Sequence, residues 1–182
     1  YEKGLIKELG LSNTGPKRLN FLYKKLKERG IKIKSIQMQF SLLTKPSLED
    51  KDIKSFCNEN EIEYLAYSPL GLGVLTIPPN KSPKPSTFLR RKLFQRILPK
   101  TIELRTLISN IGKKYSASQA QVALNWVRSH GAKPIVGIRN PLQAKDAYSA
   151  LNWSLTQKEK EKLDFHRNNC LVNMPQNPFT SP

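Results

Sequence analysis

The stretch from Ile62 to Leu75, IEYLAYSPLGLGVL, decides the fold. Its first part is a short, mostly apolar run bounded by polar residues before it and by Pro69 after it, which predicts a buried strand that ends at Ser68. Residues 70–73 are expected to be neither strand nor helix, and their glycines leave backbone uncovered where a flat ligand could approach closely. Because parallel α/β proteins build their sites at the carboxyl ends of strands, we expect function there.

Three further strand-like runs alternate with helical ones. We predict strands within residues 5–11, 31–41 and 134–138, and helices over residues 16–29, 48–59, 88–96, 101–115, 118–130, 141–151 and 156–166. The candidate helix caps are Thr14, Ser47, Ser116 and Thr156. The alternation predicts right-handed βαβ units in a parallel sheet, with both faces of each apolar strand buried.

Four strands with their helices make about half of a (β/α)8 TIM barrel, and an open sheet of this kind needs something to cover its edges. We assign residues 1–167 to this partial barrel and residues 168–182 to an irregular tail. Residues 1–4 are expected to be the last turn of a helix, so the chain is interpreted as part of a longer protein. The proline-rich segment 76–84 is predicted to be a loop, either a functional flap or a mobile segment.

The composition predicts one soluble domain in a reducing, cytoplasmic location. Of the 182 residues 38% are apolar, and no apolar run approaches the roughly 20 residues that cross a bilayer, so no membrane partner is expected. Cys57 and Cys170 lack the spacing of a disulfide framework or zinc site and are interpreted as free thiols. Two isolated histidines, His130 and His166, indicate neither a catalytic triad nor a metal site.

The charge leaves one alternative function open. Lys and Arg outnumber Asp and Glu by 31 to 14, giving a net charge of +17 that would attract phosphates, nucleic acid or an acidic surface. The lysines are spread widely, however, and aromatic residues are not interleaved with them as single-strand binders require. We therefore favour a solvated surface over a nucleic-acid patch, and keep a basic binding module as the alternative.

Five motifs in order resemble the carboxyl half of the aldo-keto reductase family, most closely its cyanobacterial and chloroplast subgroup. They are GLSN at 10–13, QMQFSLL at 37–43, AYSPLGLGVLT at 66–76, SQAQVALNWV at 118–127 and PIVGIRNPLQA at 134–144. The resemblance implies strands 5 to 8 of a TIM barrel that uses NADPH to reduce aldehydes or ketones to alcohols. It covers nearly the whole chain up to Asp164.

The resemblance also implies a set of NADP(H)-binding residues. Tyr67 matches the tyrosine that lies against the nicotinamide, while Ser12, Asn13 and Gln37 match the residues that hold its carboxamide. An aromatic ring can fix one face of a flat ring, and Asn and Gln offer the donor and acceptor that an amide needs. Pyrophosphate contacts are expected from Ser68 and Leu70, and contacts to the adenosine 2′-phosphate from Arg139 and Gln143.

The chain departs from the family pattern at three places. The asparagine that reads the adenine amino group is replaced by Ala147, and the family's Gly-Lys-Tyr is replaced by residues 77–79. The family's catalytic Asp, Tyr, Lys and His belong to the amino half, and no residue here matches any of them, so we assign no catalytic residue to this chain. Reduction of a carbonyl substrate is therefore expected only with an amino-terminal half barrel, in the same or another chain.

Each assignment has a purely structural alternative. Tyr67 would otherwise be a core tyrosine, Gln37 a buried amide bonded to nearby backbone, Ser12 and Asn13 turn residues, and Arg139 a solvated residue at a helix start. For the whole chain the alternatives are an inactive remnant that binds nucleic acid or an acidic partner, and a fragment that does not fold alone.

Overall fold

The computed structural model contains one parallel sheet of four strands in the order β1-β2-β3-β4. It describes residues 1–44, 48–83, 85, 87–170, 172 and 174, and only the backbone of residues 48–50. The strands are β1 (Leu9–Ser12), β2 (Ile33–Gln39), β3 (Glu63–Tyr67) and β4 (Lys133–Pro134). The four predicted strands therefore exist in the predicted parallel arrangement.

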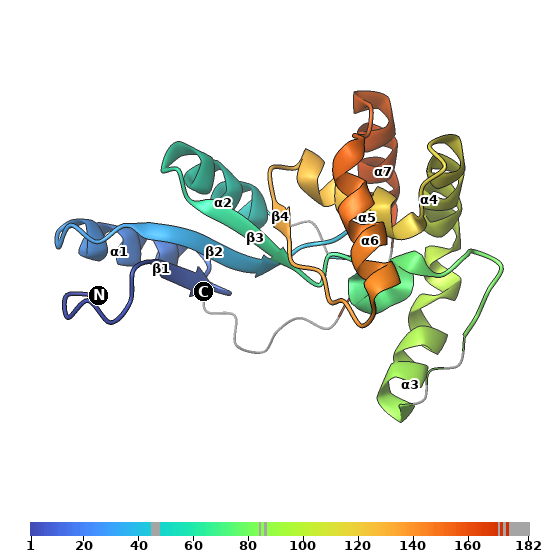
Figure 1. Cartoon of the computed structure of the whole chain (residues 1–182), viewed down its shortest axis with the longest axis horizontal. Coiled ribbons are helices and arrows are strands. Elements are labelled where there is room, and N and C mark those ends of the chain that lie inside the picture. Colours follow the sequence, from blue (N-terminus) through green and yellow to red (C-terminus); the bar gives the residue numbers. More distant parts are fainter. Residues whose placement is uncertain (45–47, 84, 86, 171, 173, 175–182) are drawn as a thin grey trace.

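All seven predicted helices are present. They are α1 (Pro16–Lys27), α2 (Leu48–Glu59), α3 (Phe88–Ile97), α4 (Ile102–Lys114), α5 (Gln119–Ser129), α6 (Pro141–Ser149) and α7 (Gln157–Asn169), with short 3-10 helices η1 (Gly71–Thr76), η2 (Pro99–Thr101) and η3 (Ala150–Asn152). Figure 1 shows α1 and α2 along the sheet, α4 to α7 gathered beyond β4, and α3 set apart from them. None of these described helices is long and apolar enough to span a membrane.

The core lies between the sheet and the helices, with aromatic residues at its centre. Phe40, which follows β2, stacks on Trp126 of α5 with ring centroids 5.0 Å apart, and its edge meets Tyr64 of β3. Both Phe40 and Trp126 are almost completely buried. The apolar stripe on α5 is thus what fixes this helix against the sheet.

The other face of the sheet is only half-buried, so the expectation that both strand faces are buried is wrong for the chain described here. Gln37 and Gln39 of β2 and Tyr67 of β3 are of intermediate exposure, whereas Leu9 and Leu11 of β1 pack against the core on the opposite face. The pairing of β1 with β2 shifts between Leu9 and Gly10. Such an irregularity reverses which side chains point to the core, and it turns the two β2 glutamines away from it.

Several local predictions need correction. The N-cap of α1 is Gly15, not Thr14, and the N-cap of α5 is Ser118, not Ser116, because the Ser118 hydroxyl accepts the Gln121 amide N–H. The capping box of Thr156 is confirmed. Ser47 lies outside the described residues.

The chain ends and the glycine segment also differ from expectation. Residues 1–4 form a turn closed by a 2.8 Å bond from Gly4 N–H to the Tyr1 carbonyl, not a helix end. Residues 70–73 were expected to be non-helical, but η1 begins at Gly71 and is interrupted by positive φ angles at Leu72 and Gly73. Helix α7 continues to Asn169, into the predicted tail; of residues 170–182 only 170, 172 and 174 are described.

Candidate functional site

Four of the predicted site residues lie close together, on β1, β2 and β3 or directly after β1. Ser12 is the register partner of Gln37, and the Asn13 backbone N–H donates to the Gln37 carbonyl at 2.9 Å. The Tyr67 hydroxyl donates to Asn13 Oδ1 at 2.9 Å, and Asn13 Nδ2 donates to Ser12 Oγ at 3.1 Å. We call these four residues the strand-end cluster.

Two residues with left-handed backbone give the cluster its shape. Asn13 has φ 51° and Ser68 has φ 52°, each directly after a strand. Asparagine tolerates this conformation better than most residues because its short polar side chain can bond locally. The two bends lead the chain out of β1 and β3 and leave the Asn13 amide and the Tyr67 ring beside each other.

The cluster has hydrogen-bonding capacity to spare for a neutral ligand. An amide group offers two N–H donors and two lone pairs, so Asn13 keeps one of each after bonding Tyr67 and Ser12. Among the described residues none bonds the side-chain amide of Gln37, although this residue is half-buried. The alternative in which Gln37 is satisfied by nearby backbone is therefore not what the structure has. The arrangement suits a flat ligand with an amide group.

The other four predicted residues line a groove that starts directly after Tyr67. Its volume is about 960 Å³, and its walls include Ser68, Leu70, Arg139 and Gln143. The predicted site is thus split into two neighbouring parts, joined through the peptide bond between Tyr67 and Ser68. We call the second part the groove.

The groove is electrostatically suited to an anion at its α6 end. Arg139 lies just before α6, whose N-cap Asn140 accepts the Gln143 amide N–H at 2.9 Å, while Gln143 Oε1 accepts the Arg139 N–H. In the described part of the chain no carboxylate pairs with Arg139. A cation at a helix N-terminus is unfavourable by itself and becomes favourable when it shares an anion with the helix.

The carboxylate in the groove wall, Asp146, forms no ion pair with Arg139 among the described residues. Asp146 accepts hydrogen bonds from Ser118 Oγ and from Gln121 Nε2, both at 2.7 Å. These bonds hold its charge against the start of α5 instead of leaving it directed at Arg139. Asp146 therefore joins α6 to α5 and positions the helix that follows Arg139.

The comparisons with known proteins agree with this layout. The sequence profile of the Aldo/keto reductase family matches residues 1–168. This chain belongs to that family. Its fold is correspondingly half of the (β/α)8 barrel: the glycerol dehydrogenase of Gluconobacter oxydans, whose structure it matches with a TM-score of 0.75 and 24% identity, aligns over 100% of this chain and 54% of that one.

The aldo/keto reductase relatives are about twice as long as the chain. It is 41% identical over 179 residues to the chloroplastic pyridoxal reductase of Arabidopsis thaliana, covering 98% of this chain and 48% of that protein. It is 28% identical to an NADPH-dependent alpha-keto amide reductase of Saccharomyces cerevisiae, covering 90% and 45%. The chain thus spans about half the length of the curated relatives it matches. Because one of them is chloroplastic, the cytoplasmic location stays a prediction.

The sequence interpretation missed Arg90, which also lines the groove. Its Nη2 donates to the Leu72 carbonyl at 2.8 Å, and its buried Nε has no acceptor among the described residues. Gly73 allows this approach, because a Cβ there would lie 2.9 Å from Arg90 Nη2. The only signal in the sequence was the basic run 90–92, which does not reveal that Arg90 folds back over the glycines.

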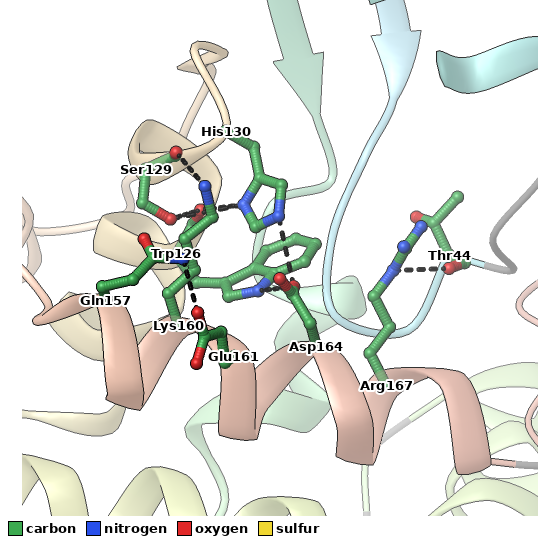
Figure 2. Close-up of polar contacts among 9 residues, drawn as sticks. All are labelled: Thr44, Trp126, Ser129, His130, Gln157, Lys160, Glu161, Asp164 and Arg167. Carbon is green, nitrogen blue, oxygen red and sulfur yellow. Dashed lines mark hydrogen bonds and ion pairs between the residues drawn. The ribbon is translucent and has the colours of Figure 1, made fainter.

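A second polar cluster lies outside the groove (Figure 2), and it brings a serine, a histidine and an aspartate together. His130 Nε2 lies 3.1 Å from Asp164 Oδ1, and Ser129 Oγ lies 3.3 Å from His130 Nδ1. Sequence spacing gave no hint of this carboxylate partner. The Ser129 hydroxyl donates to the Trp126 carbonyl, which also lies 2.9 Å from His130 Nδ1, so the histidine is not arranged to take the serine proton.

The cluster is structural. Asp164 also accepts the Trp126 indole N–H at 2.8 Å, which ties α5 to α7. Burial lowers the pKa of His130, against the raising effects of the Trp126 carbonyl and Asp164. Within the described residues no group of three potential metal ligands exists, and Cys57 and Cys170 are both free. Burial raises the pKa of the Cys57 thiol to about 11, which makes it unreactive.

Proposed function

We propose that this chain supplies the cofactor-binding half of an NADP-dependent reductase that converts aldehydes or ketones to alcohols. The observation that carries the proposal is the continuity of the strand-end cluster with the groove: an amide-binding end adjoins a channel that leads to a cation at a helix N-terminus. A dinucleotide with a nicotinamide at one end and a 2′-phosphate at the other has this distribution of chemistry.

The residues fit the two ends of NADPH. At the nicotinamide end, Tyr67 offers its ring as a flat support, and Asn13 and Gln37 offer free amide donors and acceptors for the carboxamide. At the other end, Arg139 and the start of α6 would hold the 2′-phosphate. When bound, NADPH supplies the hydride; the side chains of this chain orient it and carry no step of the chemistry.

Arg90 would contact the pyrophosphate. The family's Gly-Lys-Tyr lysine is absent after Thr76, where the chain has Ile77 and two prolines. Arg90 places a guanidinium in the same groove as Ser68 and Leu70. We expect it to provide the positive charge that the missing lysine would have supplied.

Proton donation is assigned to the amino half of the barrel. Tyr67 is an unsuitable donor because its hydroxyl proton is already donated to Asn13. The sheet ends at β1 and β4 with unpaired edges, where the remaining strands of the barrel would add. We therefore propose that reduction requires this second half, in the same or another polypeptide. The similarity to pyridoxal reductase makes pyridoxal the first carbonyl compound to test.

The decisive experiment is a titration of the complete barrel with NADPH and with NADH, followed by nicotinamide fluorescence. Arg139→Ala should weaken NADPH binding about 10- to 100-fold, the usual effect of losing hydrogen bonds to a charged group, and should leave NADH binding nearly unchanged. Lys145→Ala is the matched control, because Lys145 is an exposed cation on α6, the helix that follows Arg139, and does not line the groove.

Two results would contradict the proposal. An unmodified barrel that binds no nicotinamide nucleotide would exclude the cofactor role. Affinity for DNA that falls steeply with salt, without nicotinamide-dependent activity when the amino half is present, would favour the basic binding module instead.

A further inference from the structure

Arg105 is a fully buried cation that the proposed function does not use. Only 1% of its surface is exposed, and it lies in α4. Among the described residues no carboxylate contacts it, and burial lowers the pKa of its guanidinium. A charge in this environment is retained only when its hydrogen bonds are well satisfied.

The acceptors of Arg105 come from two segments that are distant in sequence. Its Nη1 donates to the carbonyls of Ile77, at 3.2 Å, and Pro78, at 2.7 Å. On the other side its Nη2 donates to the Leu98 carbonyl at 3.0 Å, and its Nε donates to Thr101 Oγ1 at 3.1 Å. Four of the five guanidinium N–H groups are therefore used to hold two chain segments together.

These two segments are the two ends of one excursion of the chain. Between them the structure describes residues 79–83, 85 and 87–97, which include α3 and which we call the α3 arm; Phe94 and Ile97 near its carboxyl end are buried in the core. Figure 1 shows α3 lying away from the other helices. The described residues of the arm that line the groove are Thr87, Leu89, Arg90 and Leu93. One side of the groove is thus carried by a segment whose two ends meet at a single arginine.

We propose that Arg105 is a positioning residue for the groove: it fastens both ends of the α3 arm and so holds Arg90 over the glycine segment at Leu72. This inference rests on the proposed function for its ligand, a nucleotide pyrophosphate, but its structural part stands independently. The planar fork is essential, because a lysine ammonium lacks the geometry to join carbonyls on two sides at once.

The test measures amide hydrogen exchange in α3 without nucleotide, and NADPH affinity and kcat in the complete barrel. Arg105→Met should speed exchange in α3 at least about tenfold, because the hydrogen bonds that join the two ends of the arm are lost while the core contacts of Phe94 and Ile97 remain. NADPH affinity should fall about tenfold while kcat at saturating NADPH changes less than about twofold, since Arg105 touches no reacting atom. Lys92→Met removes an exposed cation from the same arm and should leave the exchange rate in α3, the NADPH affinity and kcat unchanged.

A double-mutant cycle separates positioning from general destabilisation. If Arg105 acts through Arg90, Arg105→Met should cost little further NADPH affinity in an Arg90→Ala background. Fully additive losses, or unchanged exchange in α3, would overturn the proposal. Should Arg105→Met not fold, Arg105→Lys should show the same changes to a smaller extent, and wild-type values for it would overturn the proposal equally. If the unmodified barrel binds no NADPH, the proposed function fails, while exchange still decides whether Arg105 fastens the arm.

Discussion

Helices α5 and α6 follow one another in the chain and are held in very different ways. Every residue of α5 from Val122 to Val127 is buried, and Trp126 is bonded to Asp164 of α7. No residue within α6 is buried, and Leu142 and Tyr148 are 79% and 68% exposed. The difference indicates that the packing of α5 is complete within this chain. Helix α6, which follows Arg139, instead presents apolar surface that another element could cover.

The strands show the same contrast. Strands β2 and β3 pair on both sides, while β4, which contains Lys133 and Pro134, pairs within the described part of the chain only with β3. The predicted strand over 134–138 is therefore wrong beyond Pro134, and Ile135 and Ile138 are exposed. A strand needs a neighbour to satisfy its backbone groups, and β4 has one on a single side.

The largest expected effect comes from removing the aromatic centre of the buried region around α5, which we call the closed region. Trp126→Ala should lower the free energy of unfolding by about 3–5 kcal/mol, because it leaves a cavity against Phe40 and removes the indole N–H that donates to Asp164. Leu142→Ala, at the open helix, should change it by less than about 0.5 kcal/mol. Urea denaturation of both variants measures the difference. Equal losses would show that α6 is as tightly packed as α5.

A second contact within the closed region, the one that Glu159 makes, depends on pH. Glu159 of α7 accepts hydrogen bonds from Lys114 at 2.7 Å, Tyr115 at 2.9 Å and the Thr156 backbone at 2.9 Å. Burial alone would raise its pKa, but these bonds outweigh burial and lower the pKa to about 2. The carboxylate therefore stabilises the fold fully above its ordinary pKa of 4.5, and this contribution is lost as the pH falls from there towards 2.

Glu159→Gln should accordingly destabilise the protein by about 1–3 kcal/mol at pH 7, because the hydrogen bonds to the ionised carboxylate are lost, while glutamine can keep the capping box. The difference in the free energy of unfolding between variant and wild type should narrow below pH 4.5 and nearly vanish near pH 2. Urea denaturation at several pH values checks this. A gap that stays constant with pH would mean that the ionised carboxylate contributes nothing.

The contrast between the two regions also decides what could be predicted from the sequence. Helices such as α2 and α7, and the capping box at Thr156, depend on local pattern and were predicted closely. The length of β4 could not be predicted, because it depends on pairing and not on its own residues. Arg90 and Arg105 were missed for a similar reason: their partners lie 18 and up to 28 residues away, and no periodicity marks such contacts.

The candidate site was predictable to the extent that its residues lie in ordered motifs. Asn13 and Tyr67 are 54 residues apart, yet the register of parallel strands brings them within 2.9 Å. Spacing alone left Tyr67 open to a core assignment, and the motif around it favoured the site. What the motif did not reveal is that Tyr67 and Asn13 bond to each other, which removes the tyrosine hydroxyl as a free donor.

The smallest expected effect tests directly the contrast between the buried region around α5 and the exposed region of α6 and β4. Adding the amino half of the barrel should slow hydrogen exchange about tenfold in α6 and in residues 135–138, since new neighbours would cover Leu142 and pair the free edge of β4. Exchange in β3 should change far less, because its amides are already paired within the sheet. Exchange followed by mass spectrometry resolves these segments. Uniform protection of all segments would indicate that the whole chain folds only on association, whereas no protection of α6 would mean that its exposed leucine and tyrosine face solvent in the complete protein as well.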